Sequence, residues 1–241
     1  MMTLYPLRDD TCQLAVPMRE CSGAISYDYS RYSRNITWYG NILWSSVDTF
    51  ECSPLFDGTD DYGIVKNGSN LMEEISNSGA ISIIFWIKHH EESTGGYIIS
   101  YGEAGVDNTI TVRSLNNGQI SFAAEKDGSP LWSLSSYNTI NDNNFHFVAA
   151  VADGSEALLY LDSNLEDSAS ISEFWEKDAN KNLYIGVREV ISSGLQDWYD
   201  GYLCELRIYN RKLAQSEIQA LELYYRKFEV RPCILCPRPT L

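Results

Sequence analysis

The sequence has few basic residues, few prolines and no long apolar run. Its 241 residues include 18 Lys and Arg against 33 Asp and Glu, which gives a formal net charge of −15. A surface that binds nucleic acid needs clustered cations to neutralise phosphates, and no such cluster occurs before the C-terminal end. We therefore expect neither nucleic acid nor an anionic membrane as a partner.

The N-terminus, Met1 to Arg8, also lacks the apolar run of a signal peptide. No stretch approaches the roughly 20 apolar residues that a membrane span requires. The sequence alone thus predicts no membrane insertion and a chain that stays inside a cell or leaves it by lysis. Reduced thiols are then expected for all six cysteines: Cys12, Cys21, Cys52, Cys204, Cys233 and Cys236.

One cysteine pair, Cys233 and Cys236, has the spacing of half a zinc site or of a redox pair. A zinc site needs two further ligands. Cys12 and Cys21 would supply them if the two ends of the chain met, but free thiols are the simpler interpretation.

No segment carries the residues of a catalytic site. A glycosidase on a β-sandwich needs two carboxylates on opposite sides of the scissile bond, and no β segment places acids at alternating positions. The adjacent pairs Asp60–Asp61, His89–His90 and Glu91–Glu92 point their two side chains in different directions. His146, between two phenylalanines, is expected to pack at a sheet edge with its ring hydrogen-bonded. We therefore interpret the chain as non-enzymatic.

What the chain does contain is a series of short β segments separated by turn residues. The predicted strands are Ile36–Gly40, Ile81–Lys88, Tyr97–Tyr101, Thr109–Arg113, Gln119–Ala124, Phe145–Val151, Ala157–Leu161, Leu183–Val187 and Tyr202–Tyr209, after a candidate opening strand at Thr3–Leu7. Asn-Gly at 117–118 and Asp-Gly at 153–154 predict hairpins. Strands at this spacing, without alternating helices, indicate a sandwich of antiparallel sheets.

One helix is predicted, from Gln215 to about Tyr225, because Ile218 and Leu221 fall on one face. The proline-rich tail beyond it holds the basic residues Lys227, Arg231 and Arg238. Such a tail cannot form a core, so we expect it to dock on its own domain or on another chain. The predicted divisions are an N-terminal strand and extension (1–27), a domain (28–225) and a docking tail (226–241).

The loop at Gln196–Asp200 combines aromatic rings with carboxylates. Exposed Trp and Tyr side chains stack on sugar rings, and nearby carboxylates accept hydrogen bonds from sugar hydroxyls. Asp197, Trp198 and Tyr199 are therefore candidate glycan-binding residues. The alternative is a loop that folds its own aromatic rings underneath itself.

Several segments resemble, in order, the motifs of one family. Phe56–Tyr62 reads Phe-Asp-Gly-Thr-Asp-Asp-Tyr and is similar to that family's Phe-Asp-Gly-x-Asp-Asp-Tyr. Further similar segments are Ile81–Lys88, Gly96–Ser100, Asn141–Ala149, Leu159–Ser163, Leu183–Gly186 and Asp200–Leu213. From about Asp28 to Tyr224, the chain thus resembles a LamG-like jelly roll of the concanavalin A-like lectin/glucanase superfamily.

The resemblance implies an all-β fold, a two-sheet antiparallel jelly-roll sandwich with one short C-terminal helix and an extended tail. It also implies a calcium site at a sheet edge, with ligands at the turn of Asp57 and Gly58 and a carboxylate on the last strand. Cys204 stands at that last-strand position, and a thiol is a poor ligand for a cation that prefers oxygen. Calcium binding therefore stays open, and no other cofactor is expected.

These expectations favour a structural or binding module. Related modules occur in secreted adhesins, carbohydrate-binding appendages and bacteriophage particles. The docking tail and the lack of a signal peptide favour a virion protein, for example a decoration, capsid-associated or fibre protein that binds capsid or tail proteins and exposes a lectin-like domain. The alternative is a soluble or surface carbohydrate-binding lectin or adhesin, located outside the cell or on its surface. A glycoside hydrolase ranks third.

Overall fold

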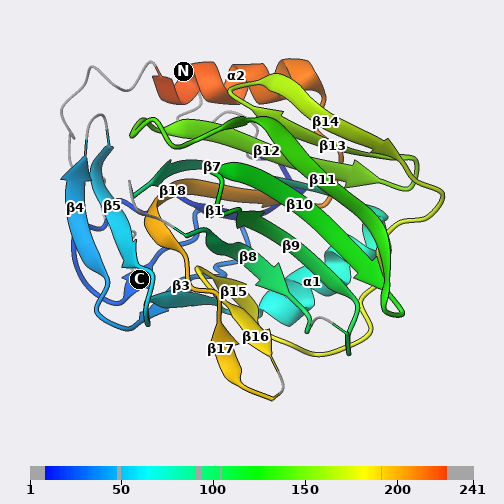
Figure 1. The fold of residues 1–241 in the computed structure, drawn as a ribbon, viewed down its shortest axis with the longest axis horizontal. Coiled ribbons are helices and arrows are strands. Elements are labelled where there is room, and N and C mark those ends of the chain that lie inside the picture. Colours follow the sequence, from blue (N-terminus) through cyan, green and yellow to red (C-terminus); the bar gives the residue numbers. More distant parts are fainter. Residues whose placement is uncertain (1–8, 48–49, 91–93, 104, 191, 227–241) are drawn as a thin grey trace.

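In the computed structural model, residues 9–47, 50–90, 94–103, 105–190 and 192–226 are described. They form a sandwich of two eight-stranded antiparallel sheets with a helix on one outer face (Figure 1). The predicted fold class is confirmed. None of the helices in these ranges has the length and apolar content of a membrane span.

Sheet A contains the central strands of the chain. Its order is β14 (Asn164–Ser170), β13 (Glu156–Leu161), β12 (His146–Asp153), β7 (Ala80–His89), β18 (Asp200–Tyr209), β5 (Phe50–Asp57) and β4 (Leu43–Val47), and β1 (Cys12–Val16) also pairs with β18. Almost every side chain of β7 is buried, on both faces of the sheet. This explains why its sequence is apolar at consecutive positions rather than alternating.

Sheet B faces sheet A across the main core. Its order is β11 (Ser129–Thr139), β10 (Gln119–Lys126), β9 (Thr109–Ser114), β8 (Gly96–Tyr101), β15 (Leu183–Ile185), β6 (Tyr62–Val65), β3 (Ile36–Tyr39) and β2 (Ile25–Ser26). A separate hairpin of β16 (Arg188–Val190) and β17 (Gly194–Gln196) projects beyond β15 (Figure 1). The alternating sequences of β3, β6 and β9 point one set of side chains into the core and the other set outward.

Both predicted hairpins are confirmed. In the β9–β10 pair, Val112 lies opposite Phe122, and in the β12–β13 pair Ala150 lies opposite Leu159. The first turn depends on Gly118, which adopts φ +82° and donates its N–H to the carbonyl of Leu115 at 2.9 Å. Glycine takes this left-handed conformation without steric cost.

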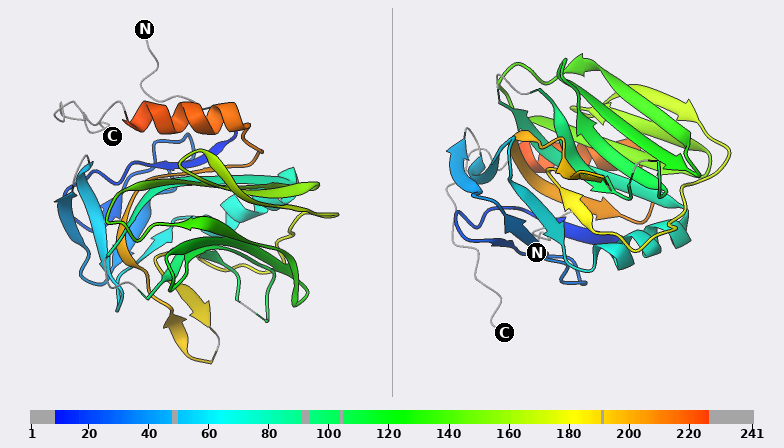
Figure 2. Two further views of the ribbon diagram at one scale, coloured as in Figure 1. Left: turned by 45° about the horizontal axis from the view of Figure 1, so that its top comes forward. Right: turned by 60° about the horizontal axis from the view of Figure 1, so that its bottom comes forward.

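The predicted C-terminal helix is present as α2 (Gln215–Arg226) and covers the outer face of sheet A (Figure 2, left). Ile218 and Leu221 are fully buried there, in a second apolar core with Trp86 and Phe147 of sheet A. Burial of each such side chain is worth about 1.5–3 kcal/mol. The helix is therefore held by tertiary packing and not by propensity alone.

A second helix, α1 (Gly68–Ser78), was not predicted, and the expectation of a single helix is wrong in this respect. Its buried face has only Leu71, Met72 and Ile75, which join the main core. The helix ends at Gly79, whose φ of +70° forms a left-handed C-cap. Three apolar positions over eleven residues give a weak periodic signal, so packing against the open end of the sandwich decides this helix.

The structure describes a strand inside the predicted N-terminal extension but does not test where the predicted divisions fall. Strand β1 lies within the predicted 1–27 extension and pairs antiparallel with β18, with Val16 opposite Leu206. The candidate strand Thr3–Leu7 and the tail residues Lys227, Arg231 and Arg238 lie outside the described residues. The division at 27–28 and 225–226 stays a prediction.

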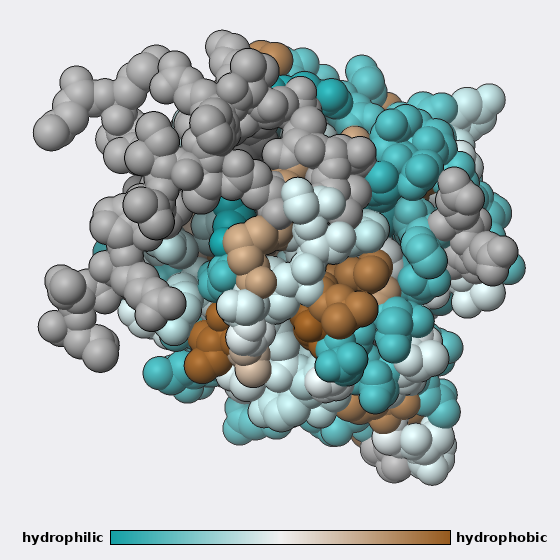
Figure 3. All heavy atoms as spheres, turned by 90° about the vertical axis from the view of Figure 1, so that its left-hand side faces the viewer, coloured by the Kyte–Doolittle hydropathy of each residue, from teal (hydrophilic) through white to brown (hydrophobic). Residues whose placement is uncertain are grey.

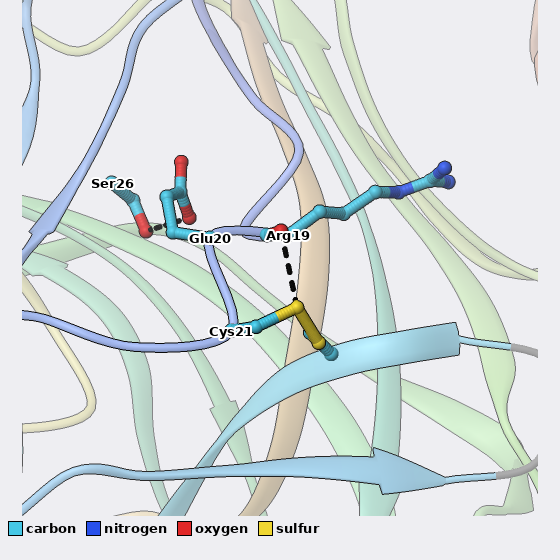
Figure 4. The surroundings of a disulfide bond; sticks show 5 residues. Arg19, Glu20, Cys21 and Ser26 are labelled. Atoms are coloured by element: carbon cyan, nitrogen blue, oxygen red, sulfur yellow. Dashed lines mark hydrogen bonds between the residues drawn. A yellow bond between two sulfur atoms is a disulfide. The ribbon is translucent and has the colours of Figure 1, made fainter. Parts of the chain in front are cut away.

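A disulfide joins Cys21 and Cys52, which corrects the expectation of reduced thiols at these two positions. It ties the loop after β1 to β5 (Figure 4). Glu20 of this loop accepts a hydrogen bond from the hydroxyl of Ser26 on β2 at 2.8 Å. Cys12 and Cys204 are free and buried, while Cys233 and Cys236 lie outside the described residues. The two cysteines are 31 positions apart in the sequence, so only the fold brings their sulfur atoms together.

On the side of the molecule where β4 and β5 lie, apolar patches interrupt a mostly polar surface (Figure 3). Large exposed apolar side chains of the molecule include Ile25 on the edge strand β2 and Leu43 on the edge strand β4. Scattered exposed apolar side chains are normal for protein surfaces.

Candidate functional site

The outer face of sheet B is the broad face that neither helix covers (Figures 1 and 2). Helix α2 lies over sheet A, and α1 inserts its apolar side chains into the main core at the end of the sandwich. Outward-facing side chains of β3, β6 and β9 are partly or fully exposed there, whereas every residue of β8 and β15 is buried.

Four aromatic side chains gather on this face, and we call them the aromatic cluster: Tyr39, Tyr62, Tyr184 and Trp198. Tyr39 and Tyr62 are cross-strand partners whose rings stack 4.8 Å apart at an angle of 13°. The Tyr62 ring also lies 6.3 Å from the tilted ring of Tyr184 and forms an edge-to-face contact with Trp198 at 5.8 Å, both measured between ring centroids. Tyr39 remains 42% exposed, so the stacked pair offers an open aromatic surface.

The strand alternation explains why these rings point outward. In β3, Ile36 and Trp38 are buried in the core, so Tyr39 must face the other way. In β6, Gly63 faces inward directly against Trp38, where an added Cβ would lie 2.5 Å from the indole ring. A bulky indole on one strand is thus accommodated by a missing side chain on the next.

Of the three predicted glycan-binding residues, only two reach this face. Trp198 packs against Tyr62, and Asp197 is exposed. Tyr199 is fully buried, and its hydroxyl donates to the carbonyl of Lys88 at 3.1 Å. The prediction that Tyr199 contacts a sugar is therefore wrong, because successive side chains of an extended segment point in opposite directions.

The loop is held close to the sheet by its backbone. The N–H of Tyr97 donates to the carbonyl of Asp197 at 2.9 Å. An added Cβ on Gly96 would lie 2.4 Å from the carbonyl oxygen of Trp198, so glycine is needed at this crossing. These contacts fix Asp197 and Trp198 against β8.

Beside the aromatic cluster lies a second group, the arginine cluster of Tyr97, Arg113 and Arg188. The guanidinium of Arg188 lies 5.0 Å from the centroid of the Tyr97 ring, and that of Arg113 lies 5.6 Å away. Arg188 also donates to the Tyr97 hydroxyl at 3.4 Å and pairs with the Asp197 carboxylate at 2.5 Å. Asp197 thus links the two clusters, because its neighbour in the chain is Trp198.

Sequence reasoning missed Tyr39, Tyr62, Tyr97, Arg113 and Arg188. Tyr39, Tyr62 and Arg113 occupy outward positions of alternating strands, so the sequence pattern carried a signal for them. Tyr97 on the buried strand β8 and Arg188 on β16 had no such signal. What could not be read was which strands become neighbours. The order β9, β8, β15, β6, β3 places Tyr184 opposite Ile64, 120 positions away in the chain.

The possible calcium position holds three carboxylates, Asp57, Asp60 and Asp61, whose ligand oxygens lie within 4.8 Å of one another. Asp57 accepts the N–H of Thr59 at 2.9 Å, and this bond helps to lower the pKa of its carboxyl group. Asp61 accepts the N–H of Asn41 at 2.8 Å, while burial and the charge of Asp57 raise its pKa. Backbone N–H groups of this chain therefore already donate hydrogen bonds to the carboxylates of Asp57 and Asp61.

The last strand does supply an acid to this corner, but not at the predicted position. Cys204 is fully buried in the second core, under α2. Asp200 instead lies opposite Asp57 in the β5–β18 pair. Its Cβ is 3.1 Å from the place where a Cβ on Gly58 would stand, so a glycine with φ +75° suits the turn. Carboxylate oxygens are suitable donors for Ca²⁺, and Asp57, Asp60 and Asp61 are the side chains that would hold it.

The pairs Asp60–Asp61 and His89–His90 separate as predicted, and Glu91–Glu92 lies outside the described residues. Asp61 is 2% exposed whereas Asp60 is exposed. His89 is buried with its Nδ1 2.9 Å from the amide oxygen of Asn141, and His90 is exposed and 3.5 Å from Asp200. The hydrogen bonding predicted for the His146 ring is confirmed, since both ring nitrogens lie 2.8 Å from carboxylates. Its strand β12 lies between β13 and β7 and is not at a sheet edge, so that part of the prediction is wrong.

With this geometry in place, the family can be assigned. The model of the family described as the concanavalin A-like lectin/glucanases superfamily matches residues 57–219, more than half of the chain. The chain belongs to this family. No curated protein matches the sequence closely enough to count as a relative.

Among solved structures, the chain is similar to receptor-binding domains of botulinum neurotoxins. One is a structure of botulinum neurotoxin type C, whose cell entry depends on interaction with two ganglioside molecules. It has a TM-score of 0.70 at 18% identity, with 92% of this chain and 53% of that chain covered. A type DC binding domain in complex with SialylT has a TM-score of 0.67 at 16% identity, with 90% and 52% covered.

A third similar structure is a type DC binding domain in complex with rat synaptotagmin II, with a TM-score of 0.68, 16% identity and coverage of 90% and 52%. The chain spans about half the length of these structures. At this level of identity they show a shared fold. The family assignment and the fold therefore establish a lectin-type domain, within a superfamily that also contains glucanases.

Proposed function

We propose that this chain is a non-catalytic carbohydrate-binding module that holds glycans on the outer face of sheet B. The observation that carries the proposal is the stacked, open pair of Tyr39 and Tyr62, with Trp198 beside it. Three rings in contact on an uncovered sheet face have no core to fill. They offer flat apolar surface to the C–H face of a sugar ring, and each ring also carries a hydroxyl or indole N–H that can form hydrogen bonds.

Polar side chains next to these rings supply the directional contacts that a sugar needs. Asp197 presents carboxylate oxygens as acceptors for hydroxyl groups, and Arg188 presents N–H donors. The pairing between them holds both in place before a ligand arrives. A few fixed polar groups around an apolar surface are the usual composition of a small-molecule site.

The comparisons support a binding role more than an assembly role. One similar structure is of a neurotoxin whose cell entry depends on two ganglioside molecules, a second is bound to SialylT and a third to synaptotagmin II. The matched region is about half of each of those chains, so binding by this chain is part of the proposal. Neither the fold nor the comparisons support a virion, phage or capsid role, and the predicted docking tail lies outside the described residues.

The Cys21–Cys52 disulfide supports a location outside the cell or on its surface. Disulfides form and persist in oxidising compartments and are rare in the cytosol. We therefore prefer the extracellular lectin or adhesin over the virion protein as the working hypothesis, and over a glycoside hydrolase, which needs a catalytic acid pair.

A glycan array with the purified chain tests the proposal. We expect binding to a defined set of glycans and a loss of about tenfold in affinity for Trp198→Ala, equivalent to about 1.4 kcal/mol. Tyr137→Ala is the matched control, because Tyr137 is an 84% exposed tyrosine on β11 of the same sheet. A folded protein that binds no glycan on the array, or equal losses in the two variants, would refute the proposal.

A further inference from the structure

The arginine cluster is unusual for a protein with a net charge of −15. Acidic residues outnumber basic ones by 33 to 18, yet two guanidinium groups contact one tyrosine ring on the uncovered face. Arg188 forms an ion pair with Asp197. Arg113 is exposed, and within the described ranges no carboxylate forms an ion pair with it. The cluster therefore keeps one cation available for a ligand.

The position of Arg113 is fixed by the sheet. It lies directly opposite Tyr97 in the β8–β9 pair, and its guanidinium rests against that ring. A cation held over an aromatic ring loses less freedom when it binds an anion. The side chain is thus prepared to receive a negatively charged group from solvent.

The arginine cluster and the aromatic cluster form one continuous surface. Tyr97 contacts Arg188, Arg188 pairs with Asp197, and Trp198 follows Asp197 and contacts Tyr62. Along the strand order β9, β8, β15, β6, β3, four spacings of about 4.8 Å separate Arg113 from Tyr39, or roughly 19 Å in total. That span accommodates a short oligosaccharide.

We propose that this face selects acidic glycans. An uncharged sugar ring stacks on Tyr39, Tyr62 and Trp198, and a carboxylate or sulfate of the same glycan binds Arg113, with Arg188 as the second donor. This inference rests on the proposed carbohydrate-binding function and names its ligand class. A guanidinium suits the task because its fork of N–H donors matches the planar oxygens of a carboxylate or two oxygens of a sulfate.

The test compares three ligands by isothermal titration at fixed salt: a neutral oligosaccharide, the same oligosaccharide ending in sialic acid, and its sulfated form. We expect the wild-type chain to prefer each acidic form by about tenfold, and the preference to shrink as salt is added. Arg113→Gln removes the charge and leaves a shorter, polar side chain. It is expected to reduce the acidic-to-neutral affinity ratio to below about 2.

Two further variants separate this role from a structural one. Asp197→Asn frees Arg188 from its partner, and asparagine tolerates the left-handed φ of +54° at this position. Its affinity for the acidic forms is expected to rise about fivefold. Arg31→Gln, which removes an exposed arginine paired with Asp10 outside the arginine cluster, is expected to leave the ratio unchanged.

The outcomes distinguish the two proposals. If no ligand of the set or of the array binds, the carbohydrate-binding function fails. If the neutral and acidic forms bind equally, or if Arg113→Gln retains the wild-type ratio, glycan binding stands and the selection of acidic glycans is overturned. A similar fall of the ratio in Arg31→Gln would also overturn it, because the effect would then come from overall charge.

Discussion

The ring of Tyr199 meets the ring of Phe56 in an edge-to-face contact, with centroids 5.7 Å apart and both side chains fully buried. This contact joins the loop before β18 to the end of β5, two segments that are 143 positions apart in numbering. It also explains the orientation of the loop, since Tyr199 points into the core and Trp198 therefore points out. The surface that we assign to glycan binding depends on this internal anchor.

Replacing Tyr199 is expected to destabilise the fold strongly. Tyr199→Ala removes a large buried ring and should lower the free energy of unfolding by about 3–5 kcal/mol. Tyr199→Phe keeps the ring and loses the bond to the Lys88 carbonyl, for a loss of about 1 kcal/mol. Urea denaturation measures both. A loss of less than 1 kcal/mol in Tyr199→Ala would contradict the buried anchor.

The close packing of Trp38 beneath the aromatic cluster gives a second prediction. Gly63→Ala places a methyl group 2.5 Å from the Trp38 ring, and we expect a loss of about 1–3 kcal/mol from overpacking. Gly154→Ala is the matched control, because an added Cβ meets nothing within 4 Å there. Thermal denaturation of the two variants compares them directly. Equal stability would show that the strands adjust freely at this point.

Removal of the disulfide tests the link between the loop after β1 and β5. The double variant Cys21→Ser/Cys52→Ser should lose about 2–4 kcal/mol, because the unfolded chain regains the freedom of a 31-residue loop. The measurement is denaturation with and without a reducing agent. We expect the reducing agent to destabilise the wild type and to leave the double variant unchanged. Wild-type stability that is insensitive to reduction would contradict the bridge.

The ion pairs of His146 predict a pH dependence of stability. Burial alone would lower the pKa of His146, but its hydrogen bonds and charge interactions with Asp162 and Asp142 outweigh burial and raise it. A raised histidine pKa contributes stability that is complete below about pH 6.5 and is lost as the pH rises through the folded pKa.

The two carboxylates act in the opposite direction. The pKa of Asp142 falls to about 2 and that of Asp162 is also lowered, although burial opposes both shifts. Their contribution is present above about pH 4 and is lost as the pH falls. We therefore expect this cluster to contribute most between about pH 4 and 6.5.

Free energies of unfolding at pH 5.5 and pH 8, compared between wild type and His146→Gln, measure this contribution. The wild type should lose more stability toward pH 8 than the variant does. A parallel loss in the two proteins would remove His146 as the cause. Arg226 of α2 pairs with Asp162 at 3.4 Å. We therefore expect the loss of the His146 charge to affect the attachment of this helix as well.

Much of the fold was determined by local sequence features. Alternation in β9 and β10, the Asn-Gly turn between them and the apolar run of β7 each correspond to a short-range physical preference, and each prediction is confirmed. The helix α2 was readable for the same reason, since its apolar positions repeat with the helical period. Turn preferences and hydrophobic periodicity depend on residues only a few positions apart, so a short segment is enough to predict the elements that they form.

The tertiary structure decided what depends on distant segments. The bond of Cys21 to Cys52, the inward turn of Tyr199 and the stacking of Tyr39 on Tyr62 all follow from which strands become neighbours and in what register. A change of register by one residue would exchange the inner and outer faces of a strand. The sequence by itself therefore determined a concanavalin A-like sandwich with aromatic residues in its loops and strands. Only the packed sheets decided that Tyr62, Trp198 and Arg113 share one surface.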